Sequence, residues 1–436
     1  MQEKQKINII WFRNDLRTKD NPSIVRATRE ELPFLAIYVL DTDFLQKQSF
    51  GFSKTGKFRA KFLMETLENL QENLEKTKIP FIIKKGKIST IFNEITTLYD
   101  VQKIFLQNEW TAEEKKQEQE LKKILPNTEL VYSYGQFLFN PNEVKKVFRE
   151  IPDVFTHFRK KIENQLEIEA ELDVVKNTKL YINALQHLKS EKITLQDFSE
   201  EEFNLHPNSA FPFLGGENNA WKRLQNYFFE TQKLSIYKET RNGLIGTDYS
   251  SKFSAWLANG SISAVSVYHQ IKKYEAEFGA NESTYWLFFE LLWRDYFKHI
   301  SLQHGNDIFK KNGIQNKFEN HLKADKNIIT SWLEGQTNSP FVNANMLELK
   351  KTGWMSNRGR QNVASYFCKT LKQDWRIGAA YFEEMLIDYD VHSNYGNWMY
   401  VSGVGNDPRN RTFNPEKQAE QYDSDKKFRN LWLKNH

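Results

Sequence analysis

The chain has 436 residues, and at roughly 150 residues per domain this length predicts two or three domains with a large core. Its 61 Lys and Arg residues and 56 Asp and Glu residues give a formal charge of +5, which permits a nucleic-acid partner without requiring one. Aromatic residues make up 14% of the chain, which excludes disorder over most of its length.

The single cysteine, Cys368, excludes a disulfide scaffold and a cysteine-based zinc or iron–sulfur site. The histidines are scattered without a metal-ligand spacing, so no metal is expected. The apolar run before Arg13 is too short for a signal peptide, and no stretch reaches the ~18 apolar residues of a membrane span. We therefore expect a cytoplasmic protein without membrane association.

Strand and helix patterns alternate over residues 1–133. Lys57–Lys76 carries apolar residues at helical spacing, and short apolar runs predict strands at Ile7–Phe12, Phe34–Leu40, Pro80–Lys84, Lys103–Gln107 and Glu129–Tyr132. Strands separated by helices predict a doubly wound parallel sheet, so this part is expected to be an α/β domain. Gly51–Lys57 has phosphate-loop spacing, but Phe58 follows where a Mg²⁺-binding Ser or Thr is needed. We interpret it as a loop that leads into a helix.

The sequence pattern changes after residue 133. Residues 134–205 are rich in charge and predict an interdomain linker with some helix. Residues 206–436 lose the strand alternation and predict an all-α domain. Its expected helical segments are Asn219–Phe229, Ser261–Phe278, Tyr285–His304, Asn327–Glu334, Asn343–Thr352, Arg358–Leu371 and Gly378–Tyr389.

Two segments of the helical half concentrate residues that suit a ligand. Tyr237–Ser254 combines hydroxyls, glycines and the start of a helix, a composition that suits a phosphate; the alternative is an ordinary capped loop. Glu290, Trp293 and Arg294 share one helix face. This face suits a ligand, and the alternative is an ion pair beside a half-buried tryptophan.

Two later segments also concentrate residues that suit a ligand. Asn357, Arg360 and Gln361 share a face of amide and guanidinium donors that fits phosphates or base edges, and the alternative is a solvated basic helix start. Asp388–Tyr400 holds two carboxylates and an amide, then Trp398. Its Asn and Gly residues predict an interrupted helix with free backbone groups, and the alternative is a turn between helices.

These strings resemble the photolyase/cryptochrome flavoproteins, and most closely the cryptochrome DASH branch. The match covers nearly the whole chain in the family's order, through Trp11–Arg17, Glu239–Gly246, Asp248–Ser254, Glu290–Tyr296, Trp354–Gln361, Asp388–Asp390, Ser393–Trp398, Gly403–Arg409 and Phe413–Pro415. The resemblance implies an α/β antenna domain over 1–133, a linker over 134–205, a helical FAD-binding domain over 206–436, and a monomer.

The resemblance also assigns site residues. Those expected at FAD are Tyr237, Ser250, Ser251, Ser254, Arg294, Asn357, Arg360, Asp388, Asp390 and Asn394. The expected lesion pocket consists of Glu290, Trp293, Asn357, Gln361 and Tyr400, with Arg358 and Arg411 on DNA. The expected electron carriers are Trp398 and Trp375, and the family's third tryptophan falls at Leu322, which cannot carry a hole. Glu109, with Asn108, resembles the position that binds a methenyltetrahydrofolate antenna; the alternative is a polar residue at a strand end.

The implied activity is that of a deoxyribodipyrimidine photolyase, a carbon–carbon lyase. It repairs cyclobutane pyrimidine dimers under blue light by electron transfer from excited reduced FAD. Gln361 and Tyr400 stand where dimer photolyases usually have Met and a second Trp. This more polar pocket offsets less of the free energy of opening a duplex, which predicts a preference for single-stranded DNA. The (6-4) photolyases have histidines at the positions of Asn357 and Gln361, so the absence of histidine there argues against (6-4) repair. The alternative is a blue-light photoreceptor or regulatory cryptochrome that binds nucleic acid without repair.

Overall fold

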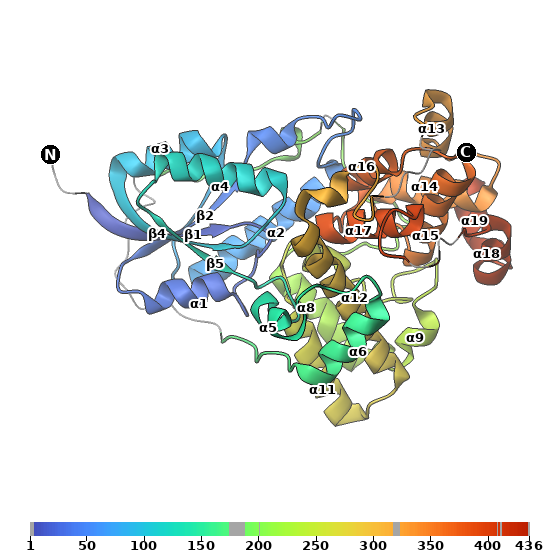
Figure 1. Ribbon diagram of the computed structural model, residues 1–436, viewed down its shortest axis with the longest axis horizontal. Helices are drawn as coiled ribbons and strands as arrows, with labels where there is room; N and C mark the ends of the chain where they lie inside the picture. The colour runs from blue at the N-terminus through green and yellow to red at the C-terminus, as the bar shows by residue number, and fades with distance from the viewer. Residues whose placement is uncertain are drawn as a thin grey trace.

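The computed structural model describes residues 4–173, 188–199, 201–316, 323–407, 409 and 412–434. An α/β domain occupies one end of the molecule and a helical domain the other, so that strand β1 (Gln5–Phe12) and helix α19 (Lys427–Leu433) lie far apart (Figure 1). This arrangement confirms the predicted fold class.

The α/β domain is built on a five-stranded parallel sheet in the order β3-β2-β1-β4-β5. The other strands are β2 (Phe34–Leu40), β3 (Phe81–Lys85), β4 (Tyr99–Gln107) and β5 (Glu129–Ser133). Every predicted strand is present, and β4 begins four residues before its predicted start at Lys103. Tyr99 and Val101, which begin β4, are buried against helices, a contact that the local pattern did not indicate.

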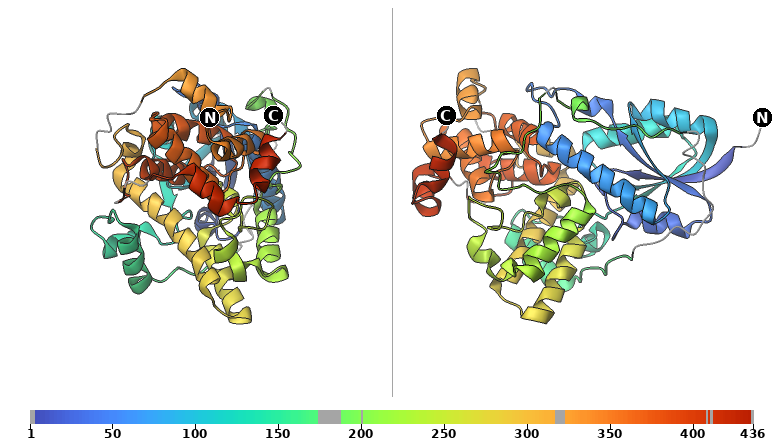
Figure 2. Two further views of the ribbon diagram at one scale, coloured as in Figure 1. Left: turned by 90° about the vertical axis from the view of Figure 1, so that its right-hand side faces the viewer. Right: turned by 180° about the vertical axis from the view of Figure 1, so that it is seen from behind.

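Helices cover both faces of this sheet (Figures 1 and 2). Ile9 and Trp11 of β1 pack toward α3 (Ile88–Leu98) and α4 (Ala112–Ile124). Ile10 and Phe12 pack toward α1 (Pro22–Arg29) and α2 (Lys57–Lys76). Burial on both faces explains why the strands are continuous apolar runs. Helix α2 begins directly after Gly56, so the Gly51–Lys57 segment is the loop into a helix that we inferred.

The segment predicted as an interdomain linker packs into the helical domain. It contains α5 (Pro141–Val147), α6 (Phe155–Gln165) and a short 3-10 turn (Leu195–Asp197), and Phe155, Phe158 and Ile162 of α6 are buried in the main helical core. Residues 174–187 and 200 lie outside the described part of the chain.

The helical domain contains α8 (Glu217–Gln225), α9 (Tyr237–Thr240), α10 (Ser254–Ala258), α11 (Ala264–Phe278), α12 (Glu282–His304), α13 (Lys326–Leu333), α14 (Pro340–Thr352), α15 (Asn357–Ser365), α16 (Trp375–Met385), α17 (Val391–Ser402), α18 (Pro415–Tyr422) and α19. Single π-helical turns at Asn226–Glu230 and Tyr366–Thr370 continue α8 and α15. Within the described residues, none of these helices combines the length and apolar character needed to cross a membrane.

The predicted interruption after Asp390 is wrong, because α17 is a continuous helix. The Asp390 side chain accepts the Ser393 N–H and starts the helix as its N-cap. Gly396 lies against Phe297 of α12, where a Cβ atom would come within 2.4 Å of the ring. The glycine therefore permits a close helix contact, and the tertiary packing outweighs the poor helix propensity of Asn and Gly.

Buried polar contacts join the two domains. Glu217 at the start of α8 accepts hydrogen bonds from the Thr18 N–H and hydroxyl and from the Lys19 N–H, each at 2.8 Å. Arg17 donates to the Gly260 carbonyl at 3.0 Å. Because Arg17, Thr18 and Glu217 are buried, these contacts fix the orientation of the sheet against the helical domain.

Candidate functional site

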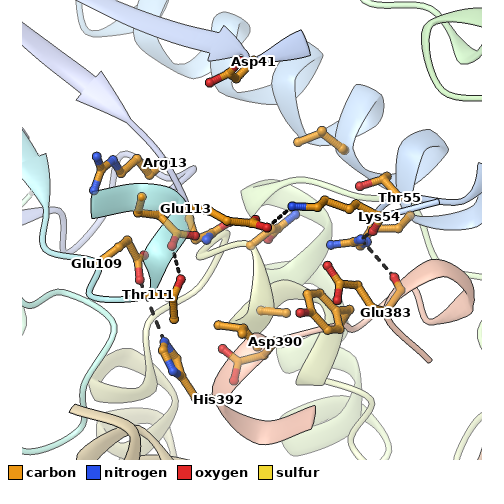
Figure 3. Close-up of a pocket in the computed structure, with 18 of the residues that line it drawn as sticks. Arg13, Asp41, Lys54, Thr55, Glu109, Thr111, Glu113, Glu383, Asp390 and His392 are labelled. Carbon is orange, nitrogen blue, oxygen red and sulfur yellow. Dashed lines mark hydrogen bonds and ion pairs between the residues drawn. The ribbon is translucent and has the colours of Figure 1, made fainter. Parts of the chain in front are cut away.

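A cavity of about 580 Å³ lies between the two domains. Its floor is the point where the strand order reverses between β1 and β4, which is where open parallel sheets bind ligands. Arg13 and Glu109, which follow these two strands, line the cavity together with Asp390 and His392 of the helical domain, and Glu109 lies beside His392 (Figure 3). Asn108 does not line the cavity and instead continues the backbone pairing with Ser133.

Glu109 is a buried carboxylate held in its charged form. Its Oε1 accepts a hydrogen bond from Gln107 at 2.7 Å, and its Oε2 lies 4.0 Å from His392 Nε2. Burial alone would raise the pKa of Glu109, but the nearby His392, the charge of Lys298 and the hydrogen bond from Gln107 outweigh it and lower this pKa. Trp110 stacks on the His392 ring with centroids 4.3 Å apart. The carboxylate is therefore charged and fixed in orientation.

Asp390 lines the same cavity. Its Oδ2 forms a buried ion pair with Lys298 Nζ at 2.7 Å. Burial opposes the charged carboxylate, yet the charges of Lys298, His392 and Arg294 hold the pKa of Asp390 well below its ordinary value. Arg294 also lines the cavity and donates to the backbone carbonyls of Gln136 and Leu257. Asp390 and Arg294, two residues expected at FAD, therefore line the side of the cavity that the helical domain forms.

A second charged cluster lies inside the helical domain. Arg360 donates to both carboxylate oxygens of Asp388 at 2.9 Å and lies over the Trp354 ring. The buried Lys252 ammonium lies over the same ring and has no hydrogen-bond partner among the described residues. Burial raises the pKa of the nearby Glu348 to about 8, partly offset by Lys252. Buried polar atoms without partners fit a site that a polar cofactor completes.

The serine loop beside this cluster is held by a residue far from it in sequence. Arg223 of α8, itself buried, donates to the carbonyls of Ser250 and Ser251 at 3.2 Å and pairs with Asp248 at 2.9 Å. Ser254 then starts α10. Ser250 and Ser251 therefore lie on a loop that Arg223 holds, and Ser254 lies at the start of the helix that follows it.

Glu290 forms an ion pair with a partner that the sequence did not indicate. Arg241 Nη2 lies 2.5 Å from Glu290 Oε1, and the Tyr237 ring lies close enough to both for their charges to affect its pKa. Burial raises the pKa of Glu290, and Arg241 lowers it in part. Because the Glu290 side chain is 30% exposed, it can reach a ligand that approaches from solvent.

Two aromatic rings stand at right angles beside Glu290. Trp293 of α12 and Tyr400 of α17 meet edge to face, with centroids 5.9 Å apart and planes at 87°. Phe155 of the linker stacks on Trp293 at 3.7 Å and supports it from one side. The two rings form a wedge with walls from two helices, which offers two non-coplanar aromatic surfaces to a heterocyclic ligand.

The start of α15 completes this region. Arg358 donates to Gln361 Oε1 at 2.9 Å and to Asn242 Oδ1 at 3.0 Å, while Asn357 is exposed. Asn242 follows Arg241 directly, so a chain of polar contacts runs from Glu290 to Gln361. The structure therefore groups these residues of the expected lesion pocket on one side of the domain.

The expected electron carriers lie in one apolar cluster. Asn394 donates to the Ala379 carbonyl at 3.0 Å, and Trp398 lies one turn later on α17. Trp375 starts α16 and donates to the Lys311 carbonyl. Both tryptophans are buried. Leu322 and Arg411 lie outside the described residues.

The comparisons with known proteins agree with this architecture. Residues 8–176 match the family described as DNA photolyase, and residues 286–435 match the FAD binding domain of DNA photolyase. The chain is 42% identical to the cryptochrome DASH of Xenopus laevis, over 98% of this chain and 82% of the relative. The chain belongs to the photolyase/cryptochrome family. The match to the FAD binding domain supports FAD as its cofactor.

Further relatives and solved structures give the same result. The cryptochrome DASH of Synechocystis is 40% identical over 98% of this chain and 87% of the relative. The crystal structure of a Synechocystis cryptochrome superimposes with a TM-score of 0.92 at 39% identity, over 100% of this chain and 90% of that one. A bacterial class III photolyase from Agrobacterium tumefaciens gives a TM-score of 0.82 at 25% identity, over 100% of this chain and 88% of that one. These similarities place the chain on the cryptochrome DASH branch.

Some residues of the sites were missed at the level of sequence. Arg241 and Lys298 were not assigned, although each is a cation beside a motif residue, and Lys298 lies one helical turn after Arg294. Arg223 and His392 were also missed, because Asp248 and Glu109, the carboxylates with which they pair, are more than twenty residues away.

Proposed function

We propose that this protein is a photolyase that uses light and bound FAD to split cyclobutane pyrimidine dimers in single-stranded DNA. The observation that carries the proposal is the wedge of Trp293 and Tyr400 beside the paired Glu290. A dimer that has left the base stack presents two non-coplanar rings and polar edges, and this wedge offers two perpendicular rings and a carboxylate to receive them.

FAD, when bound, supplies the electron that opens the cyclobutane ring and takes it back afterwards. Asp388, Arg360 and the serine loop would hold it. Glu290 would hydrogen-bond the polar edge of the dimer. Arg241 and Arg358, which are cations paired with Glu290 and Gln361, would contact the DNA phosphates.

Single-strand preference follows from the pocket's composition. Gln361 is held by Arg358, and Tyr400 offers a smaller ring than tryptophan. Such a pocket gains less free energy from a flipped dimer than an apolar one does. A duplex substrate must also lose stacking and pairing, a few kcal/mol for each flipped base. The single strand does not carry this penalty.

The decisive experiment uses one thymine dimer placed in a single-stranded oligonucleotide and in its matched duplex. Protein with fully reduced FAD is illuminated with blue light, and repaired strands are counted. We expect repair of the single strand and little of the duplex. Equal repair of both would refute the strand preference. Repair of neither would refute the photolyase proposal and favour a photoreceptor that binds nucleic acid.

We also propose that the interdomain cavity holds a folate antenna such as methenyltetrahydrofolate. Glu109 offers a charged carboxylate to the ring N–H donors of a pterin. Arg59, farther along the cavity, has a buried Nε without a hydrogen-bond partner in the described chain, which suits the anionic tail. Titration with the folate, followed by its absorption and by energy transfer to FAD, tests this. Wild-type protein that binds no folate would refute it.

A further inference from the structure

A third buried tryptophan lies beside Trp398. Trp332 of α13 is fully buried and meets Trp398 edge to face, with centroids 6.4 Å apart and planes at 75°. Tyr381 of α16 contacts the Trp332 ring in turn, with centroids 6.0 Å apart. The three rings belong to one apolar cluster. An indole–indole–phenol series therefore starts at Trp398 of α17 and runs through α13 to α16.

We propose that Trp332 and Tyr381 form a branch that supplies electrons to Trp398 when light reduces bound FAD. This inference rests on the proposed function only in that it needs light-excited FAD beside α17. Trp398 gives one electron to the excited oxidised FAD, Trp332 gives one electron to oxidised Trp398, and Tyr381 gives one electron to oxidised Trp332. The Tyr381 phenol proton passes to water. One electron and one proton from an external thiol then restore the tyrosine.

The chemistry of the side chains fits this sequence. Indole and phenol are the protein side chains most easily oxidised by one electron. Trp332 Nε1 is buried and has no hydrogen-bond partner among the described residues. An oxidised Trp332 therefore has no acceptor for its proton, keeps its positive charge and remains a strong enough oxidant to take an electron from a phenol.

Charge also favours a hole at the end of the branch. The carboxylates of Glu384 and Glu334 lie close enough to Tyr381 to raise its phenol pKa, in addition to the larger effect of burial. Negative charges that disfavour a phenolate stabilise a positive hole at the same ring. The branch thus ends at a ring that lies near two carboxylates.

Trp375, the other tryptophan of the cluster, contacts a ring at the interdomain cavity. Trp375 contacts Tyr395 edge to face with centroids 6.0 Å apart, and Tyr395 lines the interdomain cavity. The family's next position is Leu322, an aliphatic residue that cannot be oxidised. A branch through Trp332 bypasses this position, since it starts at Trp398 itself.

The test compares Trp332→Phe and Tyr381→Phe with wild type in the FAD-containing protein without DNA. The readouts are the rate at which light reduces oxidised FAD in the presence of a thiol, and the transient electron paramagnetic resonance signal of tyrosine deuterated on its ring. We expect both variants to lower the rate several-fold and to remove the tyrosyl signal. Tyr366→Phe is the matched control, because Tyr366 is a buried phenol of the same cluster, 8% exposed against 6% for Tyr381.

Tyr381→Phe removes one oxygen atom and keeps the ring, so it remains informative if Trp332→Phe does not fold. An unchanged rate and an unchanged tyrosyl signal in Tyr381→Phe would overturn the inference. Repair is scored separately, with wild-type protein whose FAD has been reduced chemically. Wild type that photoreduces through Tyr381 but repairs no dimer would sink the proposed function and leave the branch standing.

Discussion

The buried ion pair between Lys298 and Asp390 permits a quantitative test of how charge pairing at the interdomain cavity stabilises the fold. The two side chains are 4% and 10% exposed, and their charged atoms are 2.7 Å apart. Asp390→Asn retains a good N-cap for α17, since Asn caps helices as well as Asp, but removes the charge. The substitution therefore leaves the Lys298 ammonium buried without its nearest counter-charge.

Breaking a buried pair from one side costs roughly 3–5 kcal/mol of folding free energy. We expect the lower end, about 3 kcal/mol, because Glu109 still attracts Lys298. Lys298→Met combined with Asp390→Asn removes both charges, so the double variant should regain most of this loss. Urea unfolding at saturating FAD, followed by tryptophan fluorescence, measures all three proteins.

The pH dependence has a definite sign. The pKa of Asp390 is depressed in the folded protein, below the ordinary 3.8, because Lys298, His392 and Arg294 outweigh the effect of burial. Its contribution to stability is therefore complete above the unfolded pKa and is lost as pH falls through the folded one. The difference in free energy of unfolding between wild type and Asp390→Asn should be constant from neutral pH to about pH 5. It should disappear only in stronger acid. This reasoning would be refuted if Asp390→Asn lost no more than ~1 kcal/mol of folding free energy, which is typical of an exposed pair. It would also be refuted if the double variant were less stable than Asp390→Asn.

Three further substitutions test the sites. Glu290→Ala should abolish most dimer repair while FAD stays bound at wild-type stoichiometry, and repair at the wild-type rate would mean that the wedge is not the lesion pocket. Glu109→Gln should weaken folate binding by at least tenfold, about 1.4 kcal/mol, without changing FAD content; equal affinity in a fluorescence titration would contradict the charged role of Glu109. Gly378→Ala would place a Cβ 2.2 Å from the Trp398 ring, so we expect a loss of about 1–3 kcal/mol in unfolding experiments, and no loss would show that α16 and α17 are not packed as described.

Most of the α/β half, apart from the start of β4, could be derived from local patterns. Its strands are buried on both faces, so they are continuous apolar runs such as Phe34–Leu40, and Lys57–Lys76 shows the helical period across its whole length. In the helical half, segment positions were predictable because amphipathic spacing is local, but the change to a π-turn at Tyr366–Thr370 was not.

The assembly of the sites depends on contacts between residues that are distant in the chain. Asn394 and Gly396 have weak helix propensity, yet they form a continuous helix because Phe297 packs against Gly396 and Asp390 caps the first turn. Glu290 was recognisable from its string, but Arg241 became its partner only when α9 packed on α12. Trp332 carried no signal in sequence and acquires its proposed role from its position beside Trp398. Local patterns specify which elements form, whereas burial and long-range charge pairing decide which side chains meet.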